Sequence, residues 1–304
     1  MLIISLVGEQ PLPVLIPLLQ KPKAYGEFLL VATSFVKGVA QNITNVLHSD
    51  TRFSHLKIHE PLIASAYNMQ ITRDAILQVL DRCSHKETPV VINLTGGTKI
   101  MSLSAQQAAF AMEIPLIYVS SEKNEIIYFN AKSMELRREK IKVKISVRQY
   151  LEVYGLEVSD NQAFDPARGP TIAPLKEGDE LESEVFARVS SSEKFDDVTH
   201  KTYIRKLTKA GEVKNELDVV ATRNGRLVVC SCKDVKDLTN DHIYELSSLS
   251  RREQAGIYCG KVLVLGHKTR PTQAFIDRAR SSSIELVFGD EIEHVVDHFL
   301  SASK

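Results

Sequence analysis

The segment Val90–Met101, which reads VVINLTGGTKIM, decides the fold of the first half of the chain. Its opening residues, Val90–Leu94, are mostly β-branched and predict a buried strand. Gly96 and Gly97 then allow a tight turn, because glycine adopts backbone angles that other residues avoid. Across Lys99–Met112 the apolar residues recur at helical spacing. A strand, a glycine turn and a helix in this order are typical of a parallel sheet.

The same alternation runs through the rest of the first half. The other predicted strands are Leu2–Val7, Phe28–Ala32, Leu56–His59 and Pro115–Val119, and the other predicted helices are Leu12–Leu19, Phe35–Leu47 and Thr72–Arg82. A hairpin that begins with Glu125–Asn130 and returns between Leu136 and Val147 is expected to close this unit. Short turns between alternating strands and helices predict an α/β fold with a mostly parallel, doubly wound sheet.

The regular pattern fails between Glu157 and Gly178, where proline, glycine and aspartate are frequent, and this segment predicts an interdomain linker. A second set of elements follows it. Its predicted helices are one that begins near Asp179, two at Asp241–Gln254 and Pro271–Arg280, and one at the end of the chain. Its predicted strands are Lys201–Leu207, Glu216–Thr222, Arg226–Cys232, Lys261–Gly266 and Glu285–Val287. We therefore expect a first domain at 1–150, a linker at 151–175 and a small α/β domain at 176–304.

The bulk composition limits the kinds of partner that the chain can bind. Its 304 residues suffice for two domains, and its 38 basic and 38 acidic residues give no overall positive field. Any site for a polyanion must therefore be local. The four cysteines, none of them in a CxxC pair, predict free thiols. The apolar start is too short to span a bilayer, so we expect a cytoplasmic protein that does not bind membranes.

The loops at the carboxyl ends of the predicted strands form the candidate ligand site, because ligands of such sheets bind there. The glycines let the backbone approach a ligand, the following helix start offers amide groups, and Lys99 adds a charge, so the chemistry fits a phosphate. A lone Gly-Gly pair is often only a turn, and neither a P-loop nor a GxGxxG motif is present. The candidate ligand-binding residues are Gly8, Gln10, Pro11, Thr33, Ser34, Thr95, Gly96, Gly97, Thr98 and Lys99.

The loop from Asn93 to Lys99 resembles the signature of CARF domains, the sensors of CRISPR-associated effectors, and the opening SLVGEQPLP resembles their first-strand loop. The resemblance covers the first half and implies a Rossmann-like domain. It also implies a symmetric homodimer that binds a cyclic oligoadenylate, with cyclic tetra-adenylate the expected activator. This implication agrees with symmetry, because a ring of identical nucleotides matches an isologous dimer.

The second half carries a candidate nuclease site on its predicted hairpin. Asp218 lies in one strand and Lys233 at the end of the partner strand, so the turn between the strands brings them side by side. A carboxylate that holds Mg²⁺ or Mn²⁺ and a lysine that stabilises charge are what metal-dependent nucleases need. Glu182 or Glu184, on the preceding helix, offers a second carboxylate. The layout resembles the restriction-endonuclease-like PD-(D/E)xK domain of CRISPR ancillary nucleases, which favours Glu182.

The chain departs from that family's pattern at one position. The usual ExK triplet has an acid two residues before the lysine, and this chain has Ser231 there. A hydroxyl is a poorer ligand for a hard cation than a carboxylate. Either Glu182 supplies the charge, the Cys232 carbonyl contributes, or metal binding is weak. The candidate catalytic residues are Asp218, Lys233 and Glu182, and the candidate metal ligands are Asp218, Glu182 and Cys232.

The two resemblances together imply a metal-dependent endonuclease of type III CRISPR defence that a cyclic oligoadenylate activates and that cuts DNA, RNA or both. Two alternatives stay open. One is a ligand-responsive regulator that binds nucleic acid without cutting it, although the second half shows no helix-turn-helix pattern. The other is a sensor that also degrades its own ring ligand.

Overall fold

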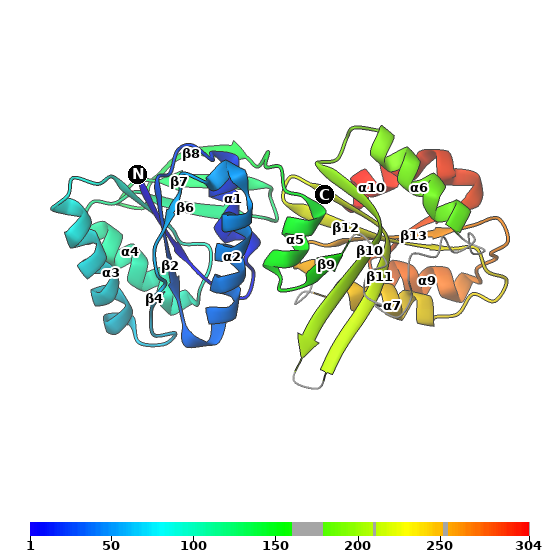
Figure 1. Ribbon diagram of the computed structural model, residues 1–304, viewed down its shortest axis with the longest axis horizontal. Coiled ribbons are helices and arrows are strands. Elements are labelled where there is room, and N and C mark those ends of the chain that lie inside the picture. Colours follow the sequence, from blue (N-terminus) through cyan, green and yellow to red (C-terminus); the bar gives the residue numbers. More distant parts are fainter. Residues whose placement is uncertain (160–178, 209–210, 252–254, 304) are drawn as a thin grey trace. The chain divides into compact units, whose positions relative to one another are not determined.

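The computed structural model describes residues 1–159, 179–208, 211–251 and 255–303. The chain divides into two units, Met1–Lys144 and Ile145–Lys304, and Figure 1 shows a sheet with helices in each. Among the described residues, no helix is both long and apolar enough to cross a membrane.

The first unit is built on one sheet with strand order β3-β2-β1-β5-β6-β7-β8, in which β4 also pairs with β2. Strands β1 to β6 run parallel where they pair, and β7 and β8 add an antiparallel edge. The strands are β1 (Leu2–Leu6), β2 (Glu27–Ala32), β3 (Lys57–Ile58), β4 (Leu62–Ile63), β5 (Val90–Asn93), β6 (Leu116–Ser120), β7 (Glu125–Phe129) and β8 (Glu135–Lys140). The parallel strands place their carboxyl ends at one edge of the sheet.

Helices cover both faces of this sheet. They are α1 (Leu12–Gln20), α2 (Lys37–Ser49), α3 (Met69–Ser84) and α4 (Lys99–Ala111), with 3₁₀ turns η1 (Ser34–Val36) and η2 (Thr51–Phe53). Alternate residues of β1, such as Ile4, pack with Ile76 of α3 and Met101 of α4 in one fully buried cluster. Figure 1 shows α1 and α2 on the opposite side of the sheet. The predicted α/β, doubly wound architecture is confirmed.

The second unit has a mixed six-stranded sheet with the order β14-β13-β12-β11-β10-β9. Strands β9 to β12 pair antiparallel, whereas β12, β13 and β14 run parallel. The strands are β9 (Glu157–Ser159), β10 (Asp197–Thr208), β11 (Gly211–Arg223), β12 (Arg226–Lys233), β13 (Gly260–Leu265) and β14 (Glu285–Phe288).

The helices of this unit are α5 (Val147–Val153), α6 (Asp179–Ser191), α7 (Asp241–Leu249), α9 (Gln273–Ser281) and α10 (Val295–Ala302), with the 3₁₀ turn η3 (Gly289–His294). Val185 of α6 and Phe299 of α10 pack against neighbouring strands of the sheet, on Val219 of β11, Cys230 of β12 and Val262 of β13. This packing defines one face of the sheet, and Asp218 lies just beyond it, where the pairing of β11 with β12 ends at Val219 and Cys230.

The structure differs from the sequence-based elements near the domain boundary. The return strand ends at Lys140, and Val147–Val153 forms helix α5, which begins with a capping box between Ser146 and Gln149. Strand β9 pairs with β10, so 151–159, which the sequence placed in a linker, belongs to the second unit. The remainder of that linker, 160–175, and the expected domain start at 176–178 lie outside the described residues. Helix α7 ends at Leu249, and 252–254 also lie outside them.

Candidate functional site

Two glycines hold the loops after β1 and β5 against each other at the carboxyl edge of the first sheet. A Cβ on Gly96 would lie 1.9 Å from the carbonyl oxygen of Leu6, and one on Gly8 would lie 2.9 Å from the amide nitrogen of Gly97. No side chain fits at such distances, so both positions require glycine. Gly97 has a φ of +75°, in the left-handed region that favours glycine.

The Thr95 side chain ties this loop to the neighbouring strands. Its hydroxyl donates to Asn93 Oδ1 at 2.6 Å and accepts from the amide of Val119 at 2.7 Å. The fully buried Asn93 in turn donates from Nδ2 to the carbonyl of Pro13 at 2.9 Å. The Thr95 hydroxyl thus uses its one donor and one acceptor site inside the protein, so this residue shapes the loop.

The start of helix α4 presents the groups that remain available to an anion. Thr98 is its N-cap: the hydroxyl accepts from Met101 N at 3.2 Å and donates to the carbonyl of Ala66 at 2.6 Å. Within the described part of the chain, the amides of Lys99 and Ile100 make no hydrogen bond, as expected for a first helical turn. Lys99 is exposed. Two amides, a helix start and a cation therefore lie together.

The other candidate ligand-binding residues lie on two neighbouring loops at the same edge. Gln10 and the buried Pro11 follow β1, and Pro11 occupies the N-cap position of α1. Thr33 and Ser34 follow β2, where Thr33 is 8% exposed and Ser34 is exposed. All ten candidate residues thus lie on the loops after β1, β2 and β5.

In the second unit, Asp218 is bonded to the segment opposite it. Its Oδ2 accepts from the amide of Cys232 at 2.7 Å and from the hydroxyl of Ser231 at 3.1 Å. The register pairs Val219 with Cys230, which places Asp218 and Ser231 next to each other on adjacent strands. The predicted pairing of the two strands is therefore present, and Ser231 contacts Asp218 directly.

Lys233 ends β12 and is held through its main chain. Its carbonyl accepts from the amide of Gly266 at 2.9 Å and from the Thr269 hydroxyl at 3.1 Å. Thr269 is 3% exposed, and its Oγ1 also accepts from the amide of Val235 at 3.0 Å. Burial first, and then the charge of Lys233, lower the pKa of His242 on α7 below its ordinary value. A neutral imidazole therefore lies near the lysine.

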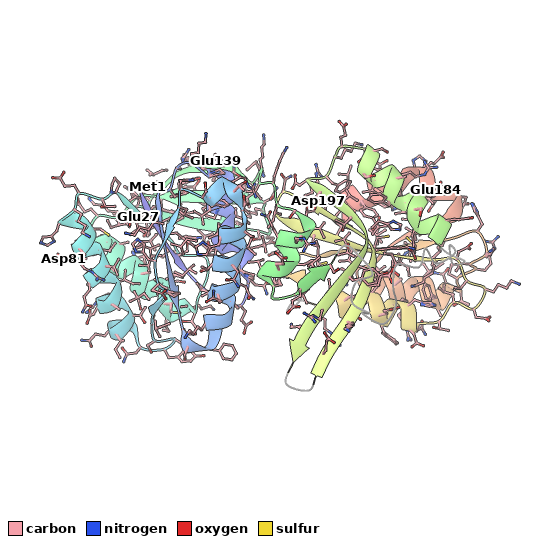
Figure 2. The ribbon with its side chains drawn as sticks, viewed as in Figure 1. Met1, Glu27, Asp81, Glu139, Glu184 and Asp197 are labelled. Carbon is pink, nitrogen blue, oxygen red and sulfur yellow. The ribbon has the colours of Figure 1, made fainter. Side chains whose placement is uncertain are left out.

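Glu182 lies on α6 beside a histidine of β10. Its Oε2 is 3.7 Å from His200 Nε2, and His200 stacks on Phe186 with a centroid separation of 5.3 Å. Glu184, the alternative on the same helix (Figure 2), instead forms an exposed ion pair with Arg188 at 2.8 Å. Of these two carboxylates, Glu182 is the less exposed, at 17% against 46%.

The charges of Asp218 and Glu182 both act on the Cys232 thiol. A hydrogen bond with Cys230 and burial raise its pKa well above the ordinary value, and the charges of Asp218 and Glu182 raise it further. The thiol therefore stays protonated near neutral pH, and only the main-chain oxygen of Cys232 suits a hard cation. Within the described ranges, no three His, Cys, Asp or Glu side chains form a metal-binding group.

Sequence reasoning missed four contributing residues: Asn93, His200, His242 and Thr269. Asn93 stands inside the quoted loop motif, so its position was a signal. The remaining three have no local motif, because each comes near the site through strand register or loop packing.

The fold and these sites define a class of protein in which a CARF sensor domain precedes an endonuclease domain. Residues 2–150 match the Card1 CARF domain, and 172–304 match the Card1-like endonuclease domain. The two halves of the chain therefore belong to these two domain families, and their resemblance to a CARF sensor and a CRISPR ancillary nuclease is confirmed. No curated protein matches the sequence.

Solved structures share the whole architecture at low identity. Protein VC1899 from Vibrio cholerae superposes with a TM-score of 0.82 at 16% identity, over 99% of this chain and 98% of that one. Can2 from Sulfobacillus thermosulfidooxidans, solved with cyclic tetra-adenylate, gives 0.76 at 20% identity over 100% and 99%. A type III CRISPR defence DNA nuclease activated by cyclic oligoadenylate gives 0.65 at 16%, over 90% of this chain and 46% of the other.

Proposed function

We propose that cyclic tetra-adenylate binds the loops after β1, β2 and β5 and thereby activates phosphodiester hydrolysis by the second unit, on DNA, RNA or both, in the cytoplasm. The observation that carries the proposal is the union of a CARF domain and an endonuclease domain in one chain. The Can2 structure with cyclic tetra-adenylate, which spans the full length of this chain, supports the choice of ring.

The active form is proposed to be a homodimer. Several apolar side chains near the sensor loops and on α3 and α4 are exposed: Tyr67 is 85%, Ile71 57%, Leu103 51% and Phe110 57% exposed. Large apolar side chains exposed on neighbouring helices are typical of an interaction surface. A second copy would cover them and would supply the other half of a site for a symmetric ring.

The donor set in the second unit fits a divalent cation such as Mg²⁺ or Mn²⁺. Asp218 Oδ1 makes no hydrogen bond within the described residues, whereas Oδ2 is bonded to Ser231 and Cys232. Asp218 and Glu182 would hold the cation with the Cys232 carbonyl, since oxygen atoms are the ligands these ions prefer. When bound, such an ion polarises a phosphate and acidifies a water molecule.

Lys233 is the proposed charge-stabilising group. Two hydrogen bonds to its carbonyl hold the main chain of Lys233 at the end of β12, two residues after Ser231. A cation that is already in place stabilises the charge that develops on a phosphate without further reorganisation.

A second candidate function is a regulator that binds nucleic acid and does not cut it. Ser231, which replaces the usual acid and bonds to Asp218, favours this candidate because it removes one carboxylate from the donor set. Activation by the ring also requires that the ring prefer the active state, since equal affinity for both states shifts nothing.

The deciding experiment incubates the protein with plasmid DNA and single-stranded RNA in Mn²⁺ or Mg²⁺, with and without cyclic tetra-adenylate. We expect cleavage only with the ring, and loss of cleavage in Asp218→Asn with ring binding unchanged. Asp290→Asn, an exposed acid of the same unit, is the matched control. Ring binding without cleavage would favour the regulator, and linear adenylate fragments would indicate that the ring itself is degraded.

A further inference from the structure

A cavity of about 620 Å³ lies in the first unit at the edge of the sheet opposite the ring loops. It is lined at the amino-terminal starts of the strands by Leu2 of β1, Glu27 of β2 and Lys57 of β3, and by Thr88 just before β5. Because these strands are parallel, their starts share one edge, and the loops after β1, β2 and β5 share the other. The cavity therefore uses none of the candidate ring-binding residues.

The floor of this cavity is apolar and ordered. Leu2, Leu29 and Val79 are 4%, 7% and 8% exposed, and they belong to the buried core cluster of the unit. Such a floor favours a ligand with an apolar or aromatic body, because covering apolar surface removes it from water.

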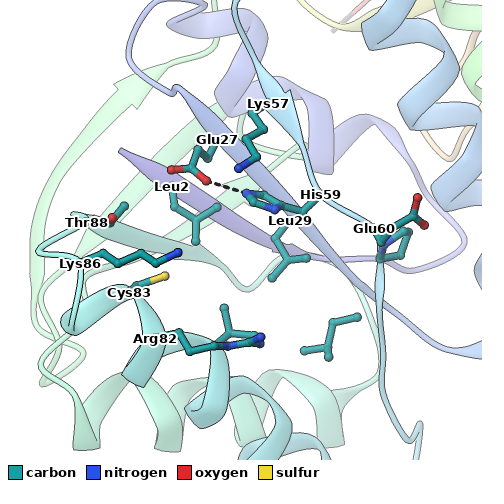
Figure 3. Close-up of a pocket in the computed structure, with 13 residues that line it drawn as sticks. Leu2, Glu27, Leu29, Lys57, His59, Glu60, Arg82, Cys83, Lys86 and Thr88 are labelled. Atoms are coloured by element: carbon teal, nitrogen blue, oxygen red, sulfur yellow. Dashed lines mark hydrogen bonds and ion pairs between the residues drawn. The ribbon is translucent and has the colours of Figure 1, made fainter.

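The rim of the cavity carries an excess of positive charge. Figure 3 shows Lys57 on the strand side and Arg82 and Lys86 on the helix side. Among the described residues, none of these three cations forms an ion pair with a carboxylate. Arg82 uses only Nε, which donates to the Gln78 carbonyl at 3.1 Å, so the outer nitrogens of its guanidinium remain available.

The two acids of the lining do not cancel this charge. Glu27 Oε2 lies 2.6 Å from His59 Nε2, so an imidazole already partners that carboxylate. Glu60 is exposed on the loop between β3 and β4. The lining thus carries three cations, Lys57, Arg82 and Lys86, against two carboxylates, Glu27 and Glu60, and this excess of positive charge favours an anion.

We propose that this cavity binds a small organic phosphate of the nucleoside-phosphate class. The phosphates would lie among Lys57, Arg82 and Lys86, where a guanidinium offers paired donors to phosphate oxygens. The ring system would lie on the Leu2–Leu29–Val79 floor. The volume falls within the range of about 300–1,000 Å³ that is usual for small-molecule sites. This inference is independent of the proposed function.

The test titrates ADP into the full-length protein by isothermal calorimetry in EDTA and low salt, with and without saturating cyclic tetra-adenylate. EDTA prevents ADP from binding through a metal ion at Asp218, and the ring occupies the loops at the opposite edge. We expect ADP to bind equally well in both conditions. Pyrophosphate should bind more weakly, since it has no body to cover the floor. Equal affinity for the two ligands, or displacement of ADP by the ring, would overturn the proposal.

Matched variants locate the binding. Lys57→Gln/Lys86→Gln removes two rim cations, and Lys123→Gln/Lys132→Gln removes two exposed cations of the same unit away from the cavity. The first pair should weaken ADP binding by about tenfold or more, as expected for lost charge-assisted hydrogen bonds, and the second should leave it unchanged. Equal affinities in the two double variants would contradict the assignment.

Cys83 supplies a second readout, the protection of a side chain inside the cavity. Its thiol lines the cavity, and the other three cysteines belong to the second unit. Bound ADP should slow alkylation of Cys83, measured by mass spectrometry of the peptide, and the ring alone should not. If ADP binds while Cys83 reacts at an unchanged rate, the nucleotide lies elsewhere and the proposal fails.

Discussion

The hydroxyl of Ser231 donates to Asp218 Oδ2 at 3.1 Å, alongside the amide of Cys232 at 2.7 Å. The residue that replaces the usual acid is therefore a hydrogen-bond donor to the candidate metal-binding carboxylate. Two donors on one oxygen hold the Asp218 carboxylate in one orientation. The same serine removes a negative charge from the donor set, so it orders the aspartate while it weakens the attraction for a cation.

Ser231→Glu restores the acid and should lower the Mn²⁺ concentration needed for half-maximal cleavage by about tenfold, because affinity rises with ligand charge. Without metal, the new carboxylate lies beside Asp218, and like charges should lower the melting temperature. Thermal melts with and without Mn²⁺ check both effects. Ser231→Ala is the control, since it removes only the hydroxyl. An unchanged Mn²⁺ requirement in Ser231→Glu would show that this position does not face the cation.

Lys233→Met should reduce ring-activated cleavage by about 100-fold or more, the scale observed when one charge-stabilising group is removed. Ring affinity should stay the same.

Thr269→Val should act indirectly, because it removes the hydroxyl that holds the Lys233 carbonyl. We expect it to lower the cleavage rate while Thr269→Ser, which keeps the hydroxyl, retains it. Equal rates in Val and Ser variants would mean that the bond is dispensable.

His242 should make stability depend on pH. Burial and the nearby Lys233 lower the pKa of its imidazole in the folded state. Above the pKa of the unfolded state, the His242 imidazole is neutral in both the folded and the unfolded protein. It then does not change the free energy of unfolding. As the pH falls below that value the unfolded state binds the proton more readily, so stability decreases. Between pH 7 and pH 5, the melting temperature of His242→Gln should therefore fall less than that of the parent protein. An equal fall in both proteins would contradict a lowered pKa of His242.

Gly96→Ala tests the close approach of the two sensor loops. The new methyl group would meet the Leu6 carbonyl, so we expect a loss of at least about 2 kcal/mol in the free energy of unfolding. Gly38→Ala is the matched control, because nothing lies within 4 Å of its Cβ position in α2. That change should be neutral or stabilise by up to about 1 kcal/mol. Urea unfolding curves measure both, and equal stabilities would contradict the packing.

Lys99 and Thr95 should affect ring binding in different ways. Lys99→Gln removes an exposed charge at the start of α4 and should weaken cyclic tetra-adenylate binding by about tenfold at unchanged melting temperature. Thr95→Val removes the bonds to Asn93 and Val119, so it should lower both affinity and melting temperature. Lys132→Gln, an exposed lysine between β7 and β8, is the control for charge. Ring affinity that is insensitive to Lys99 would place the phosphates elsewhere.

The sequence by itself determined the elements and the edge of the first sheet at which the loops gather. The β-branched run before Asn93, the glycines after it and the helical spacing beyond Lys99 are local patterns, and each predicts its conformation through backbone preference and periodicity. The hairpin with Asp218 and Lys233 was predictable for the same reason. Helix α5 was missed although Ser146 and Gln149 carry its capping signal, and β9 was missed because three residues show no period.

Only the tertiary structure decided which groups contact one another. The bond from Ser231 to Asp218 depends on strand register, and the approach of Glu182 to His200 depends on how α6 packs on the sheet. The cavity at the far edge of the first sheet joins residues from Leu2 to Thr88 that share no motif. Local preferences fix the dihedral angles of a segment, whereas contacts between distant segments are fixed by the packing of the whole core, which no short stretch of sequence contains.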